Sequence, residues 1–172
     1  MKSYSNFISE ESLYHGSMSD LDSGKTYTAK KNKGTFGDFE KIIEKNRPNS
    51  AFSRLESFYL GSKGTVADQA PGGALYKVTP VGKYGTYYFG WIALLQNYLY
   101  DDITGMKPGH GGYTLGKIHK EKTEDVKMLV QGYFSGKKVP KKIVDQFEGE
   151  DSIEFRMKEI LAPKIKIDKL IV

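Results

Sequence analysis

Short segments rich in aromatic and β-branched residues recur along the chain, and they limit its fold more than any other feature of the sequence. Their lengths and their alternation of apolar and polar residues predict β-strands, some adjacent in sequence and others separated by helices. The predicted strands cover residues 13–15, 25–29, 57–60, 74–79, 84–89, 153–161 and 165–172. This order is typical of an α+β domain rather than of a regular repeat of strand, helix and parallel strand.

Apolar residues at helical spacing predict helices between these strands. The predicted helices cover residues 36–46, 91–99 and 123–135. Thr123 is a candidate N-cap of the last helix and Gly136 is its stop signal, although Gly132 lies inside it at a cost of about 1 kcal/mol relative to alanine. The glycine-rich segments 61–73 and 103–117 are predicted to be loops long enough to have a function.

Length and composition restrict the class of protein. With 172 residues the chain can bury one sizeable core, so we expect a single domain over residues 1–172. It contains no cysteine, which excludes disulfides, thiolate zinc sites and a cysteine nucleophile. No apolar run is long enough to span a membrane and no signal peptide is visible, so we expect a cytoplasmic protein without membrane contact.

The net charge of +5 comes from an excess of lysine. A basic balance favours nucleic acid or another acidic partner, although lysines are also the usual solubilising residues of a small domain. Much of the excess lies in three separate segments, residues 30–33, 137–142 and 164–169. The sequence leaves open whether these segments meet on one face.

Residues 23–26, Ser-Gly-Lys-Thr, resemble the end of a phosphate-binding P-loop but lack its geometry. That motif needs a glycine five residues before its Gly-Lys pair, and Ser19 stands there. The residues that follow alternate as in a strand, whereas a helix should follow a P-loop. We therefore interpret the segment as a tight turn in which Gly24 adopts a positive φ.

The histidines do not have the spacing of a metal site, and no metal is expected. His110 lies among glycines where it could meet a ligand, and a solvated loop histidine is the alternative. Acidic residues do not cluster around His119 or the other two histidines. His15 shares a strand face with Leu13, and the following Gly16 permits close approach of a ligand to the backbone. A structural histidine before a turn is the alternative for His15.

A carboxylate near the C-terminus is a stronger candidate. Apolar and charged residues alternate along residues 153–161, and continuing the pattern puts Glu159 on the apolar face beside Leu161. A carboxylate there costs several kcal/mol unless it is paired or serves a cleft, so Glu159 is a candidate functional residue. A β-bulge near Lys158 would return Glu159 to solvent, and the sequence leaves both arrangements open.

Three motifs, in this order, resemble the ADP-ribosyltransferase fold. They are LYHGS at residues 13–17, RLESFYLGS at residues 54–62 and KEILAPKIKI at residues 158–167. The likeness is to the poly(ADP-ribose) polymerase and diphtheria-toxin branch and to small members encoded by bacteriophages. The resemblance implies a split two-sheet core with about three helices. It also implies a glycosyltransferase that uses NAD as substrate and modifies a host protein or nucleic acid.

The resemblance also implies roles for individual residues. His15 would hold a ribose hydroxyl and the backbone of Gly16 the nicotinamide amide, while Tyr59 would support the cleft. Glu159 would stabilise the positive charge that develops on the ribose. The remaining residues that it places at the NAD site are Tyr14, Ser17, Arg54, Ser57 and Ser62. Of these, Arg54 and Ser57 would hold the cleft or contact phosphate.

The chain departs from the family at two places. Met157 stands where arginine-modifying members carry an acidic or amide residue, so arginine is not the expected acceptor. The nearest candidate for a tyrosine that stacks on nicotinamide is Tyr76, which lies in the next predicted strand.

Three other functions remain open. RNA 2'-phosphotransferases share the fold and the His-Gly pair, and Arg54 and His119 are their loose phosphate-contact candidates here. The same fold without turnover could inhibit or bind a partner. A basic nucleic-acid-binding module is the third alternative.

Overall fold

The computed structural model describes residues 12–31, 37–69, 72–99, 103–104, 114–115, 123–147 and 157–171. Over these residues the chain forms antiparallel sheets and five α-helices, which confirms the predicted α+β class. The expected number of about three helices was wrong, because two short helices, α2 and α5, lie in segments without a helical apolar pattern.

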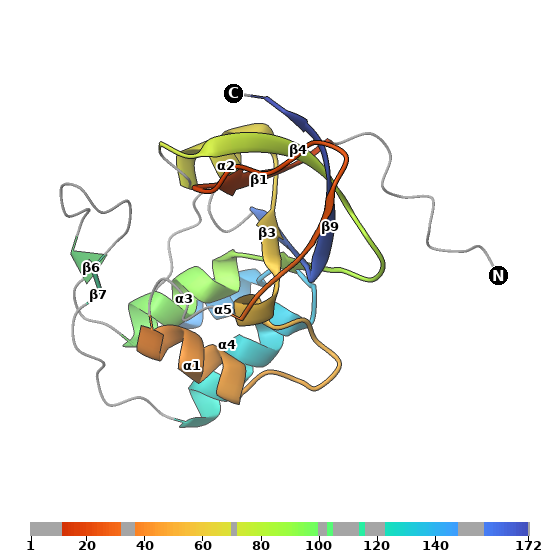
Figure 1. Ribbon diagram of the computed structural model, residues 1–172. Helices are drawn as coiled ribbons and strands as arrows, with labels where there is room; N and C mark the ends of the chain where they lie inside the picture. The colour runs from red at the N-terminus through yellow and green to blue at the C-terminus, as the bar shows by residue number, and fades with distance from the viewer. Residues whose placement is uncertain are drawn as a thin grey trace.

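The strands form two main sheets (Figure 1). The first sheet has the order β1 (Leu13–Ser17), β4 (Ala74–Pro80), β9 (Lys164–Leu170), β2 (Thr26–Thr28). The second has the order β3 (Phe58–Leu60), β8 (Lys158–Ala162), β5 (Gly85–Tyr88). A further short pairing joins β6 (Ile103–Thr104) to β7 (Thr114–Leu115), inside the segment predicted to be a loop.

Two features join the main sheets. Strand β8 leads into β9 with only Pro163 between them, so one extended segment passes from the second sheet to the first. Proline has no N–H to donate to a ladder, which suits the point where the strand changes partners. At the other junction Tyr14 and Gly61 exchange two backbone hydrogen bonds of 3.0 and 3.2 Å. The first sheet therefore lies against the end of β3.

The helices predicted from apolar spacing are present as α1 (Gly37–Lys45), α3 (Gly90–Leu99) and α4 (Thr123–Phe134). The additional helices are α2 (Lys63–Gln69) and α5 (Lys141–Gln146), with a 3-10 turn, η2 (Arg54–Glu56). Helix α2 lies in a segment whose glycines predicted a loop, so that prediction was wrong for residues 63–69. No helix among the described residues is long and apolar enough to cross a membrane.

The core has two parts. In Figure 1, α1, α3, α4 and α5 gather on one side of β3, and their apolar side chains pack with Tyr87 and Leu161 of the second sheet. The second cluster lies between the sheets. Its buried members are Leu60, Tyr76, Val78, Ala162, Ile165 and Ile167. Strands β3 and β8 contribute side chains to both clusters, so apolar residues pack against both of their faces.

The interpretation of residues 23–26 as a turn is confirmed. Gly24 has a φ of 82°, and the Lys25 N–H donates to the carbonyl of Asp22 at 3.2 Å. Strand β2 begins directly afterwards, at Thr26. A positive φ is a conformation that glycine adopts without steric cost.

Gly132, inside α4, has a packing role that the sequence did not reveal. A Cβ built at this position would lie 2.3 Å from a ring carbon of Trp91 in α3. The indole is held in place, because its Nε1 donates to the carbonyl of Lys137 at 2.8 Å. Glycine at this position therefore lets α3 and α4 approach closely.

We expect Gly132→Ala to lower the free energy of unfolding by about 1–3 kcal/mol through overpacking, even though alanine favours a helix by about 1 kcal/mol. Urea denaturation gives the midpoint that measures this change. Gly64→Ala in α2 is the matched control, because among the described residues no atom outside its chain neighbours and its own helix backbone lies within 4 Å of the added Cβ. The control should be neutral or stabilising. Equal midpoints for the two variants would contradict the packing role.

Candidate functional site

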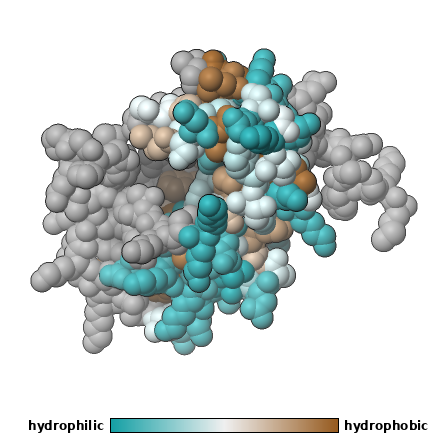
Figure 2. All heavy atoms as spheres, in the orientation of Figure 1, coloured by the Kyte–Doolittle hydropathy of each residue, from teal (hydrophilic) through white to brown (hydrophobic). Residues whose placement is uncertain are grey.

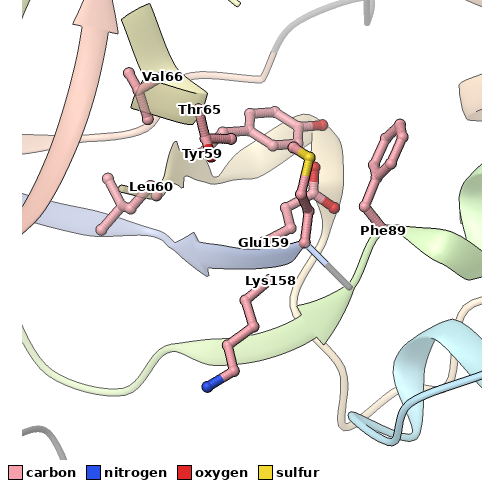
Figure 3. A pocket seen from close by; sticks show the side chains of 9 residues that line it. Tyr59, Leu60, Thr65, Val66, Phe89, Lys158 and Glu159 are labelled. Atoms are coloured by element: carbon pink, nitrogen blue, oxygen red, sulfur yellow. The ribbon is translucent and has the colours of Figure 1, made fainter. Parts of the chain in front are cut away.

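A pocket opens beside the junction of the two sheets. It is small: the centre of a water-sized molecule can occupy only about 10 Å³ of it, which is room for about one water. Residues from β3, the start of α2, the end of β5 and the start of β8 line it: Tyr59, Leu60, Gly61, Thr65, Val66, Phe89, Met157, Lys158 and Glu159. In Figure 3 the Tyr59 ring lies above the Glu159 carboxylate, Phe89 faces them, and Lys158 points away. Two predicted site residues, Tyr59 and Glu159, therefore share one pocket.

Glu159 points inward, as the alternation of its strand predicted. Its side chain is 13% exposed, and Leu161, two residues later, is fully buried. The pairing of β5 with β8 runs without a register shift, with Tyr88 opposite Lys158 and Tyr87 opposite Glu159. A bulge that returns Glu159 to solvent is therefore excluded. Residues 153–156 of the predicted strand lie outside the described residues.

The Glu159 carboxylate is fixed by two partners. An Nη1 of Arg54 donates to its Oε2 at 2.6 Å, and the hydroxyl of Tyr133 in α4 donates to the same oxygen. The same Arg54 nitrogen also donates to the Tyr133 hydroxyl oxygen at 2.9 Å. Among the described residues, the other oxygen, Oε1, has no hydrogen-bond partner. The contacts position the carboxylate and leave one oxygen available at the pocket.

Arg54 lies inside the protein and carries most of this arrangement. Its side chain is 6% exposed, and it also forms a two-pronged ion pair with buried Glu40 of α1, through Nε at 3.0 Å and Nη2 at 3.2 Å. Burial by itself lowers the pKa of Arg54, but the negative charge of Glu159 and further groups outweighs it and raises that pKa. All three guanidinium nitrogens of Arg54 therefore donate to side chains of the protein.

Two tyrosines enclose the guanidinium. The ring centroids of Tyr59 and Tyr133 lie 5.2 and 5.3 Å from its central carbon, within the range of a cation–π contact. The Tyr59 hydroxyl donates to the carbonyl of Arg54 at 3.0 Å. Burial raises the pKa of both phenols, so both stay protonated hydrogen-bond donors. Neither tyrosine is therefore placed to act as a general base near neutral pH.

His15 lies next to the pocket but does not line it. Its Nδ1 is 3.1 Å from the carbonyl oxygen of Tyr59, and its ring meets Phe58 edge-on with centroids 5.2 Å apart. Successive strand residues point to opposite faces, so Tyr14 and His15 diverge. Burial lowers the pKa of His15, partly offset by the bond to Tyr59. His15 and Glu159, which were predicted to share a cleft, both lie near the junction of the two sheets, but of the two only Glu159 lines the pocket.

The remaining predicted residues have local structural contacts. Gly16 and Ser17 pair with β4, and the Ser17 hydroxyl also donates to the carbonyl of Ser19. The Ser62 hydroxyl lies 2.9 Å from that of Thr65 at the start of α2. The buried Ser57 hydroxyl has no hydrogen-bond partner among the described residues.

The stacking candidate Tyr76 does not line the pocket. Tyr76 is only 2% exposed and accepts a hydrogen bond from the N–H of Leu21, so it belongs to the core and cannot stack on a ligand in the pocket. His110 and His119 lie outside the described residues.

Sequence reasoning missed two members of the network around Arg54, namely Glu40 and Tyr133. Glu40 was visible as an acidic residue between Phe39 and Ile43 on the apolar stripe of α1, where a carboxylate needs a partner. Tyr133 lies on the buried side of α4, where a hydroxyl also needs a partner. No local pattern indicates that both would meet Arg54.

We expect Arg54→Met to lower the free energy of unfolding by about 3–5 kcal/mol, because it leaves the carboxylates of Glu40 and Glu159 without their cation in a buried position. Urea denaturation measures the change. Lys41→Met, which removes an exposed cation paired with Asp38, is the control and should have little effect. Similar losses of unfolding free energy in the two variants would contradict a specific stabilising role of the buried network.

The lowered pKa of His15 predicts a loss of stability in acid. The unfolded chain, in which this pKa lies near 6.5, takes up a proton before the folded chain does. The contribution of His15 to the free energy of unfolding is therefore complete above about pH 6.5 and declines as the pH falls below that value. The urea midpoint should decrease when the pH is lowered from about 7.5 to about 5.5. The decrease should be smaller in His15→Asn, which keeps an N–H near the position of Nδ1. An equal fall in both proteins would refute the contribution of His15.

Comparison with known proteins adds no relative. No family model matches the chain, and no curated protein or solved structure matches it significantly. A function for the pocket therefore depends on its own geometry.

Proposed function

We propose that NAD binds at the pocket, which must widen to admit it, and that the chain transfers ADP-ribose from NAD to a protein or nucleic-acid acceptor. One observation carries the proposal: Tyr59 and Glu159, from motifs far apart in the sequence, line one pocket. The Tyr14–Gly61 backbone pair brings the His-Gly segment to the edge of the same pocket. The spatial order of these segments supports the resemblance on which the proposal rests.

The reaction needs little more than a fixed carboxylate. Breaking the bond between nicotinamide and ribose builds positive charge on the sugar, and a preorganised negative group beside it lowers the barrier. Glu159 has the required position, with Oε2 held by Arg54 and Tyr133 and Oε1 without a partner among the described residues. The acceptor then bonds to the ribose carbon and releases a proton, and nicotinamide leaves. The rings of Tyr59 and Phe89 supply apolar walls for nicotinamide.

The same contacts favour a second candidate, the fold without turnover. The cation of Arg54 offsets the charge of the carboxylate that would stabilise the ribose. His15 also does not line the pocket, so a direct ribose contact by it requires a change on binding. Under this alternative the chain binds NAD or a partner and releases no nicotinamide.

Glu159→Gln separates the two candidates. Calorimetry with NAD measures binding, and release of nicotinamide, with and without a cell lysate as acceptor, measures turnover. We expect Glu159→Gln to retain NAD binding and to lose about 10²–10³-fold in nicotinamide release, as when one preorganised charge-stabilising group is removed. Glu124→Gln is the matched control, since it makes the same substitution at an exposed glutamate of α4 that does not line the pocket, and it should keep full activity.

The outcomes are distinct. Failure of the wild-type chain to bind NAD at millimolar concentration would overturn the transferase and would restrict the second candidate to binding of a partner. Binding without nicotinamide release in any lysate would favour the second candidate. Equal activity of the wild type and Glu159→Gln would remove Glu159 from the chemistry.

A further inference from the structure

Lysines from separate segments meet on the outer face of the first sheet. Lys164 and Lys166 of β9 are exposed, while Ile165 and Ile167, which alternate with them, are fully buried. The lysines therefore point to solvent and the isoleucines to the core between the sheets. Thr28 and Thr26 of β2 lie directly opposite these two lysines, and both threonines are exposed. On the other side of β9, Thr79 of β4 lies opposite Lys166 and is also exposed.

Two backbone contacts add lysines from outside β9. The N–H of Ala29 donates to the carbonyl of Pro163 at 2.8 Å, so exposed Lys30 and Lys31 leave β2 beside the start of β9. The N–H of Val81 donates to the carbonyl of Lys164 at 2.9 Å. This contact brings the turn after β4, with exposed Lys83, to the same end of the sheet. Lysines from three segments thus converge at one end.

Farther along the same face, Lys77 of β4 lies opposite Lys169 of β9. We call the whole set the lysine face; its lysines are Lys30, Lys31, Lys77, Lys83, Lys164, Lys166 and Lys169. In Figure 2 the part of the molecule where β4 and β9 lie in Figure 1 has hydrophilic side chains mixed with less polar ones.

Little negative charge offsets the lysine face. Over the described part of the chain, none of its lysines has an ion-pair partner. Asp168 of β9 accepts a hydrogen bond from the Thr79 hydroxyl at 2.7 Å, and Asp22 in the adjoining turn is paired with Lys25. The unpaired lysines repel one another, and a polyanion would relieve this repulsion.

We propose that the lysine face binds the phosphate backbone of nucleic acid without sequence preference. Lysine and threonine side chains are both common phosphate contacts. Lys164 and Lys166 are two residues apart on a strand, or about 6.8 Å. This distance is about twice the axial spacing of charges along one nucleic-acid strand, about 3.4 Å. A row of charges at this spacing fits an extended polyanion better than a single phosphate group.

The composition of the face separates nucleic acid from other partners. Arginines that read bases are missing from it, because the two arginines described, Arg47 and Arg54, are paired with glutamates elsewhere. Elements that bind membranes combine basic residues with a broad apolar surface, whereas threonines separate the lysines here. The face thus favours contact with a sugar-phosphate backbone. This inference is independent of NAD binding in the pocket.

Fluorescence anisotropy with labelled single-stranded and duplex oligonucleotides of several sequences tests the proposal. We expect similar affinities across sequences, and we expect the logarithm of the binding constant to fall linearly with the logarithm of salt concentration. Lys164→Glu/Lys166→Glu should weaken binding about tenfold or more at low salt. Lys141→Glu/Lys142→Glu in α5 is the matched control, since it makes the same change in net charge at exposed lysines and should retain most of the affinity.

Lys30→Glu/Lys31→Glu, outside the strands, repeats the test if the β9 variant does not fold, and circular dichroism checks the fold of each protein. No binding at low salt, or equal weakening by the α5 control, would overturn the proposal. Binding to anionic lipid vesicles but not to oligonucleotides would assign the face to a membrane surface instead. A strong preference for one sequence would refute backbone recognition.

Discussion

The buried guanidinium of Arg54 is the interaction on which the candidate site depends. It joins Glu40 of α1, Tyr133 of α4 and Glu159 of β8, which are far apart in the sequence. A charge removed from water needs partners of opposite sign with good geometry, so these elements are constrained to meet at Arg54. The position of the Glu159 carboxylate is a consequence of this requirement. The same contacts that make it rigid also offset its charge, which keeps catalysis and simple binding as distinct candidates.

The division of the sheet explains where the two candidate surfaces lie. Pro163 ends pairing in the second sheet, and the chain continues as β9 in the first. Beside this junction the Tyr14–Gly61 contact adjoins the pocket that contains Glu159. On the other side of β9 the alternation of its residues sends lysines to solvent and isoleucines to the core. One continuous segment, β8 followed by β9, therefore contributes to both the pocket and the lysine face.

Much of the fold could be predicted, because long apolar patterns are local signals. The helices around Trp91 and Val126 and most strands lie within a few residues of their predicted ranges. Helices α2 and α5 were missed, since six or seven residues carry too few apolar positions to show a helical period. The inward direction of Glu159 was also readable from alternation. The stacking role considered for Tyr76 was not, because its burial depends on β9 and β1 covering β4.

The sequence by itself determined the strand and helix periods and the turn at Gly24, and it offered the inward face of Glu159 as one of two arrangements. Each depends on neighbours a few residues away, through backbone sterics or alternation. Only the tertiary structure decided that Arg54 and Tyr133 would hold Glu159, and that His15 would lie beside the pocket rather than on its wall. It also decided which lysines would meet on one face. These outcomes depend on sheet order and strand register, which bring together segments with no local signal of one another.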